Sequence, residues 1–188
     1  MPRAARTLAA CLVVAVALVA AGCGNKVESV TIGETEGIYV TVDGLKYQVQ
    51  LSRILDPSSA EDQAYLRGVP ATEIELEQDE VWFGIFMRVE NDGDEPHEAA
   101  EEFVIKDTQE AEFEPLDIDL ESNVYAYAAR ELLGGDVVPI VGSPAYDNTV
   151  GGALLLYKVR TGALYNRPLE LEIASPTGGE GAVIDLDV

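Results

Sequence analysis

The chain has 188 residues, 34 of them acidic and 12 basic, which gives a formal net charge of -22. Because nucleic-acid binding depends on lysine and arginine side chains that neutralise phosphates, this charge argues against a nucleic-acid partner and favours a soluble monomer. The two cysteines and the single histidine are too few for a structural zinc site, and we expect neither a metal nor another cofactor.

Residues 1–22 have the pattern of an export signal. Arg3 and Arg6 supply its positive start, and a run of small and apolar residues follows over residues 8–21. That run is shorter than the roughly 20 apolar residues of a membrane-spanning helix. The letters AAGC, which end at Cys23, resemble the processing site of a bacterial lipoprotein. The resemblance implies that Cys23 carries a lipid after cleavage; ordinary secretion with a free cysteine is the alternative.

These features divide the chain into three parts. We predict a signal peptide over residues 1–22, a lipidated tether with room for a first short strand over residues 23–36, and one domain over residues 37–188. Cys11 lies in the signal, so the domain has no cysteine left for a disulfide. We therefore expect the domain to face the outside of the cell membrane, with the membrane as its partner through the lipid on Cys23.

The first half of the domain contains three predicted strands and a short helix. Residues 38–42 are mostly β-branched or aromatic, and an Asp-Gly pair at 43–44 follows them as a strong hairpin-turn signal. Apolar residues then alternate over 45–51, which is typical of a half-buried strand. Residues 61–67 favour one or two helical turns. Residues 81–90 are largely apolar on both faces, which predicts a central strand.

In the second half of the domain, shorter apolar segments alternate with turns. Residues 116–150 contain prolines and glycines that argue against long regular elements. Strands are predicted over residues 103–105, 112–114, 153–159, 169–174 and 182–188. About eight or nine short strands without a long amphipathic helix predict an all-β protein with an antiparallel β-sandwich.

Three segments carry a family resemblance. They are residues 82–91 (WFGIFMRVEN), 103–107 (FVIKD) and 152–159 (GALLLYKV). In this order they resemble bacterial secreted lipoproteins with an Ig-like domain of unknown function, often labelled telomeric repeat-binding factor two, over roughly residues 45–174. The resemblance implies an Ig-like β-sandwich outside the membrane and no established reaction. The telomere label is disregarded because the acidic charge argues against DNA binding.

No segment of the sequence forms a catalytic motif. Residues 91–95 (NDGDE) offer oxygen ligands for calcium, but a polar hairpin turn is the alternative because the run lacks the EF-hand spacing. Asp117, Asp119 and Glu121 alternate, so we expect them to share one solvated face of a strand. We expect His97 to be an exposed loop residue among acidic neighbours rather than a catalytic base.

Four tyrosines are the candidate contacts for a ligand or a partner. They are Tyr65, Tyr125, Tyr127 and Tyr146, all on predicted loops or connections. Tyrosine buries a large area while its hydroxyl stays polar, which suits contact with a sugar, a peptide or a protein. The alternative is that these rings pack the loops over the ends of the sheets.

Together these features predict a non-enzymatic module that binds a ligand or an envelope protein outside the membrane. One alternative is an envelope hydrolase or metal-dependent enzyme that uses surface carboxylates. A further alternative is a subunit of a larger envelope complex, which would expose a large apolar patch.

Overall fold

The computed structural model describes residues 29–188 of the chain. The predicted signal peptide over residues 1–22 and Cys23 lie outside the described residues. Among residues 29–188, no helix is long and apolar enough to cross a membrane. This part of the chain is nearly all β, as predicted: it has twelve strands and only three short helical segments.

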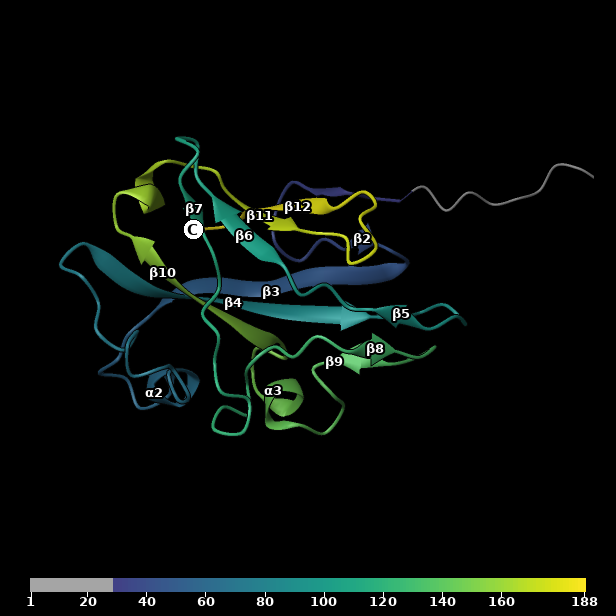
Figure 1. Cartoon of the computed structure of the whole chain (residues 1–188), viewed down its shortest axis with the longest axis horizontal. Coiled ribbons are helices and arrows are strands. Elements are labelled where there is room, and N and C mark those ends of the chain that lie inside the picture. Colours follow the sequence, from purple (N-terminus) through teal and green to yellow (C-terminus); the bar gives the residue numbers. More distant parts are fainter. Residues whose placement is uncertain (1–28) are drawn as a thin grey trace, which may run out of the picture.

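Two sheets pack face to face in the sandwich (Figure 1). The first sheet consists, in order, of β1 (Ile32–Gly33), β12 (Ala182–Leu186), β11 (Leu169–Ile173), β6 (Phe103–Lys106) and β7 (Glu112–Phe113). The second sheet consists, in order, of β10 (Ala153–Arg160), β4 (Glu80–Glu90), β3 (Leu45–Leu55) and β2 (Val40–Val42), with β9 (Val137–Val138) beside one end of β4. A small third sheet pairs β5 (His97–Glu98) with β8 (Glu131–Leu132). Strand neighbours are antiparallel, apart from the parallel pair of β1 and β12.

Apolar side chains between the two large sheets form the main core. The alternation of each strand directs these side chains inward, because successive residues of a strand point to opposite faces. In β11, for example, Leu171 and Ile173 are buried, whereas Glu170 and Glu172 are half-buried on the other face. The sequence pattern of residues 169–174 therefore predicts this strand correctly.

β4 is the central strand of the second sheet, as predicted, and both of its faces are buried. One face carries Phe83 and Ile85 into the core between the sheets. The other face carries Trp82 and Phe86 into a second apolar cluster on the outer side of the sheet. This second cluster lies on the side of the sheet where Figure 1 shows the labelled helices α2 and α3 with the loops around them. The helical segments are α2 (Asp62–Tyr65), α3 (Pro144–Asp147) and the 3-10 helix η1 (Ala163–Tyr165).

The predicted hairpin turn between β2 and β3 is confirmed. Asp43 and Gly44 have φ values of 46° and 83°, so both central residues are left-handed, as a type I′ turn requires. A Cβ atom at position 44 would lie 2.7 Å from the ring of His97, which gives a second, steric reason for glycine. The turn therefore fixes the register in which Val40 pairs with Tyr47.

Two elements differ from the sequence prediction. β3 continues to Leu55, beyond the predicted strand over residues 45–51, because a bulge between Val49 and Leu51 shifts the register and ends the simple alternation. His97 is half-buried and lies in β5 rather than on an exposed loop, because it pairs with Leu132. By contrast, β1 agrees with the short strand expected within residues 23–36, and it pairs with β12.

Candidate functional site

The candidate site lies along the outer edge of β10, which is the last strand of its sheet. Two passes of the chain cover part of this edge. Leu154 N–H donates to the carbonyl oxygen of Tyr125 at 2.7 Å, and Tyr127 N–H donates to the carbonyl oxygen of Leu154 at 2.8 Å. Further along, Leu116 N–H donates to the carbonyl oxygen of Leu156 at 2.7 Å. The edge is therefore capped at two places, by two parts of the connection between β7 and β8.

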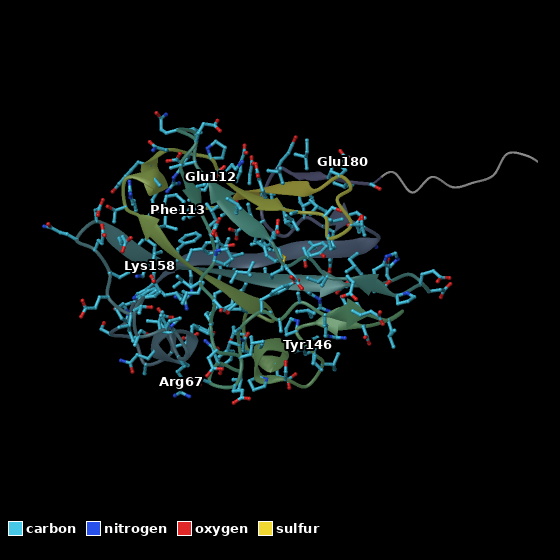
Figure 2. All side chains as sticks on the ribbon, viewed as in Figure 1. Arg67, Glu112, Phe113, Tyr146, Lys158 and Glu180 are labelled. Atoms are coloured by element: carbon cyan, nitrogen blue, oxygen red, sulfur yellow. The ribbon has the colours of Figure 1, made fainter. Side chains whose placement is uncertain are left out.

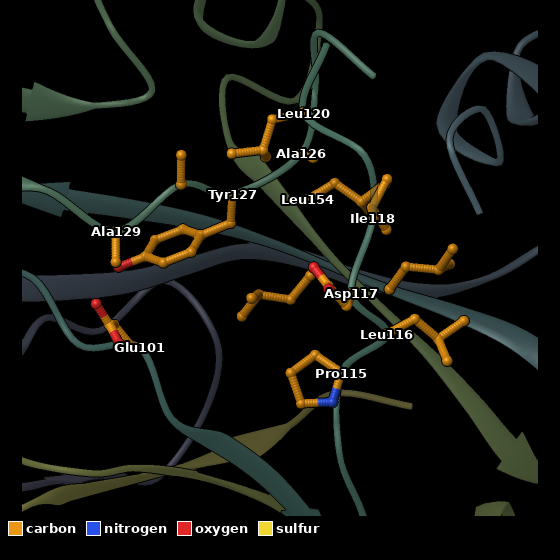
Figure 3. A pocket seen from close by; sticks show the side chains of 13 residues that line it. Glu101, Pro115, Leu116, Asp117, Ile118, Leu120, Ala126, Tyr127, Ala129 and Leu154 are labelled. Atoms are coloured by element: carbon orange, nitrogen blue, oxygen red, sulfur yellow. The ribbon is translucent and has the colours of Figure 1, made fainter. Parts of the chain in front are cut away.

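A groove of about 510 Å³ opens between these two segments (Figure 3). This volume lies within the roughly 300–1,000 Å³ that is usual for ligand sites. The lining is mostly apolar and includes Leu116, Ile118, Leu120, Ala126, Tyr127 and Leu155. Ile118 and Leu154 extend into the apolar cluster on the outer side of the second sheet, so the groove has a packed floor. Leu120, by contrast, is 53% exposed at its margin.

Two carboxylates line the groove, and three more line the hollows next to it. Glu101, from the segment before β6, and Asp117, from the segment after β7, both line the groove (Figure 3). Glu101 also lines an adjoining hollow of about 430 Å³ with Glu102 and Glu114, and another of about 320 Å³ with Glu98. We call these five residues the acidic rim. All five are exposed, and none forms an ion pair within residues 29–188.

Tyr127 forms one wall of the groove and is held rigidly. Its hydroxyl donates to the carbonyl oxygen of Ala100 at 2.9 Å, and its ring packs edge-on against Phe103 with centroids 5.1 Å apart. Burial raises the pKa of Tyr127 well above its ordinary value, and the negative charges of Tyr47, when ionised, and Glu101 act in the same direction. The hydroxyl therefore stays protonated at neutral pH and is not available as a base.

The other predicted tyrosine contacts are not gathered at the groove. Tyr65 is only 3% exposed, and its ring lies 5.0 Å, centroid to centroid, from the rings of both Phe86 and Tyr125. Tyr65 and Tyr125 both belong to the apolar packing on the outer side of the second sheet. For Tyr65 and Tyr125 the structure thus gives the packing role that is the alternative to ligand contact.

Tyr146 lies apart from the groove, on α3 (Figure 2). The guanidinium carbon of Arg88 lies 5.3 Å from the centre of its ring, which is within the range of a cation–π contact. Of the four tyrosines, Tyr127 alone lines the groove. A ligand at the groove would therefore not touch the other three tyrosines as one surface.

Residues 91–95 form the polar turn rather than an open set of calcium ligands. Asn91 is buried, and its amide nitrogen donates to the carbonyl oxygens of Glu95 and Leu132, both at 2.8 Å. Its amide oxygen accepts from Gly93 N–H at 3.0 Å. The Asn91 side chain therefore makes its hydrogen bonds to the backbone in and beside the turn. Within residues 29–188, no three or more His, Cys, Asp and Glu side chains are grouped so as to hold a metal ion.

The three alternating acids do not share a strand face, which corrects the sequence prediction. Asp117, Asp119 and Glu121 lie in a loop that crosses the outer side of the second sheet. The carboxylate of Asp119 accepts from Glu121 N–H at 3.1 Å and from the Ser122 hydroxyl at 2.5 Å, so it shapes a local turn. Turn geometry of this kind ends the period-two pattern that the sequence alone suggests.

Sequence reasoning missed most of the acidic rim. The run Glu-Ala-Ala-Glu-Glu at 98–102 is the only local signal, and it reads as an ordinary solvated stretch. Its proximity to Asp117 depends on the path of the connection between β7 and β8 along β10, which no local pattern encodes.

No protein-family model matches the sequence, and neither does any curated protein sequence. Similar solved structures include the yjhA protein of Bacillus subtilis, with 10% identity, a TM-score of 0.48 and coverage of 82% of this chain and 99% of that chain. They also include the ycdA protein of Bacillus subtilis, described as a candidate lipoprotein, with 12% identity, a TM-score of 0.46 and coverage of 84% and 39%. A third is a β-sandwich protein of Clostridium difficile 630, with 8% identity, a TM-score of 0.41 and coverage of 81% and 93%.

These likenesses are too distant to bear on the site. Every TM-score is below 0.5, and this chain spans only 39% of the ycdA structure. The β-sandwich follows from the sheets of this chain itself. The Ig-like family label stays a prediction.

Proposed function

We propose that this chain is an exported lipoprotein whose sandwich binds a ligand or a protein partner outside the cell membrane and catalyses no reaction. The observation that carries the proposal is the groove along β10, with its packed apolar floor and the unpaired acidic rim beside it. Apolar surface supplies binding energy, and a few polar groups at its margin supply selectivity. A groove of this composition suits recognition.

The sequence before the sandwich supports attachment to a membrane. The AAGC letters place Cys23 only six residues before Ser29, the first described residue. Six residues of fully extended chain span roughly 20 Å at most. A lipid on Cys23 would therefore hold the sandwich close to the membrane. Its negative charge would keep it from lying on anionic head groups.

The exposure of the groove's carboxylates supports binding rather than hydrolysis. A hydrolase that uses paired carboxylates keeps one of them protonated, usually by burying it in an apolar environment. Glu101 and Asp117 are both exposed at the groove. Tyr127 is the other titratable side chain there, and its hydroxyl is bonded to Ala100. This arrangement disfavours the alternative of an enzyme with surface carboxylates.

Attachment is tested by cell fractionation. We expect the full chain to take up labelled palmitate and to sediment with membranes when it is expressed in a bacterial host. Cys23→Ala should abolish the labelling and release the domain from the membrane fraction. An unlabelled and unprocessed wild-type chain would overturn the anchor.

Binding at the groove is tested by photocrosslinking in the same cells. A photoreactive amino acid at Leu120, which is 53% exposed at the groove, should give a discrete adduct. The matched control carries the same amino acid at Tyr165, which is 86% exposed and does not line the groove. The absence of an adduct at position 120, or the same adduct at both positions, contradicts a binding role for the groove.

A further inference from the structure

We infer that the groove along β10 takes a cationic peptide segment in which lysine or arginine alternates with apolar residues. The inference rests on the proposed function and names the class of ligand for the same groove. Two features of the groove lead to it: its charge and its apolar floor.

The negative charge around the groove favours a cationic ligand. Elsewhere on the sandwich, lysines are paired with acids, as in Lys106 with Glu112 and Glu172 at 3.1 and 3.0 Å and Lys158 with Glu73 at 3.1 Å. The five carboxylates of the acidic rim have no such partner within residues 29–188. Carboxylates of one sign around a hollow concentrate their field there and attract the opposite charge. A cationic segment would neutralise them.

The apolar floor of the groove favours a ligand that also carries apolar groups. Leu116, Ile118 and Leu155 line it, and Leu120 stands exposed at its margin. A bare metal ion or a polyamine would leave this surface in contact with water. The described residues also contain no metal-binding group of acids. Apolar side chains next to cationic ones satisfy both the floor and the rim.

The backbone edge of β10 leaves the contact with a ligand to side chains. Leu154 bonds through both its N–H and its carbonyl oxygen, because the chain at Tyr125–Tyr127 runs beside it. The carbonyl oxygen of Leu156 accepts from Leu116, and Leu156 itself is fully buried. This edge is therefore closed to an added strand, and the peptide contacts the groove through its apolar and cationic side chains.

The probes are short blocked peptides in which Val alternates with Lys, Gln or Glu. Binding to the folded domain is measured by fluorescence anisotropy, and its position by amide chemical shifts. We expect the Lys peptide to bind about fivefold or more tighter than the Gln peptide and the Glu peptide not to bind. The Leu120 amide, at the exposed margin of the groove, should shift.

Two variants with equal charge separate the rim from the general acidity of the surface. Glu101→Gln with Asp117→Asn should weaken binding of the Lys peptide by about fivefold. Glu180→Gln with Asp94→Asn removes the same charge from exposed acids away from the groove and should change binding by less than about twofold. Equal losses in the two variants overturn the inference.

Two other outcomes of the peptide experiment also test the inference. If the Gln peptide binds as well as the Lys peptide and shifts the Leu120 amide, the groove binds peptides but the cationic specificity is wrong, and the proposed function stands. If no peptide shifts the amides of the groove, the inference is overturned. The photocrosslink at Leu120 then decides separately whether the groove binds any other ligand.

Discussion

Tyr127 donates its hydroxyl hydrogen to the carbonyl oxygen of Ala100 at 2.9 Å, across 27 positions of the sequence. The N–H of Ala100 donates in turn to the hydroxyl oxygen of Tyr47 at 2.8 Å. Ala100 is fully buried, so water cannot replace either bond. The two tyrosines thus fix the crossing from β5 to β6, and with it the position of Glu101 at the groove.

Removing the Tyr127 hydroxyl should destabilise the domain. Tyr127→Phe keeps the ring contact with Phe103 but leaves the carbonyl oxygen of Ala100 buried without its donor. We expect a loss of about 1–3 kcal/mol in the free energy of unfolding, measured by urea titration. Tyr165→Phe is the control, because Tyr165 is 86% exposed, and it should leave stability unchanged. Equal stability of the two variants would contradict the role of the bond.

The same substitution at Tyr157 should have the opposite sign. The hydroxyl of Tyr157 is fully buried and has no hydrogen-bond partner among the described residues. A buried polar group without a partner costs free energy, so its replacement by hydrogen relieves that cost. We expect Tyr157→Phe to be at least as stable as the wild type in the same urea titration. A clear loss of stability would show that the hydroxyl has a partner in solution.

Stability should also fall at high pH. Burial raises the pKa of Tyr47 to about 12 from an ordinary value near 10.0. Above pH 10 the unfolded chain loses this proton and the folded chain keeps it, so the unfolded state is favoured. The contribution of Tyr47 to the free energy of unfolding is therefore complete below pH 10 and is lost as pH rises through about 12. The total loss is about 3 kcal/mol.

The measurement is the free energy of unfolding between pH 8 and pH 11. Tyr47→Phe should be less stable than the wild type at pH 8, because Ala100 N–H loses its acceptor, but its stability should decline less steeply above pH 10. Burial raises the pKa of Tyr157 as well, so some decline should persist. Parallel curves for the two proteins would exclude Tyr47 as a source of the pH dependence.

A partly buried ion pair holds α2 against β3. Arg53 binds Asp62 through two bonds of 2.5 and 3.0 Å, and Asp62 also accepts from Asp56 N–H at 2.7 Å. The side chains of Arg53 and Asp62 are 30% and 6% exposed. We expect Asp62→Asn to lower the free energy of unfolding at pH 7 by about 2–3 kcal/mol, because it leaves Arg53 without its counter-ion.

Acid should erase this difference. The hydrogen bonds from Arg53 lower the pKa of Asp62 below its ordinary value of 3.8. The ion pair therefore contributes fully to the free energy of unfolding above pH 3.8, and this contribution is lost as the pH falls through the lowered pKa. The free energies of wild type and Asp62→Asn should therefore converge below pH 3.8. Asp92→Asn is the matched control, since Asp92 pairs with Lys46 on the surface, and it should change little at either pH.

The sequence was sufficient for the longer strands, but not for the shortest strands or for the groove. β4 and β11 could be predicted because their apolar patterns depend only on which faces are buried. The bulge in β3 and the short strand β5 depend on partners elsewhere in the chain. The groove depends on still more distant partners, because Glu101 precedes β6, Asp117 follows β7, and the two meet only where the connection after β7 runs along β10.

The start of β10 offers a last test, because its position sets the edge on which the groove is built. A Cβ atom at Gly152 would lie 2.8 Å from the carbonyl carbon and 2.9 Å from the Cβ of Phe86, both on the neighbouring central strand. Neither atom can move without displacing β4. We therefore expect Gly152→Ala to lower the free energy of unfolding by about 1–3 kcal/mol.

Gly162→Ala is the matched control for this substitution. Gly162 has φ of -61° and ψ of -38°, which alanine adopts freely, and a Cβ there would meet nothing within 4 Å. It should be neutral or stabilising by up to about 1 kcal/mol, because alanine restricts the unfolded chain. Urea titration of both variants distinguishes the two sites. Equal effects would mean that β10 can move away from Phe86, and that the edge lining the groove is not fixed by this contact.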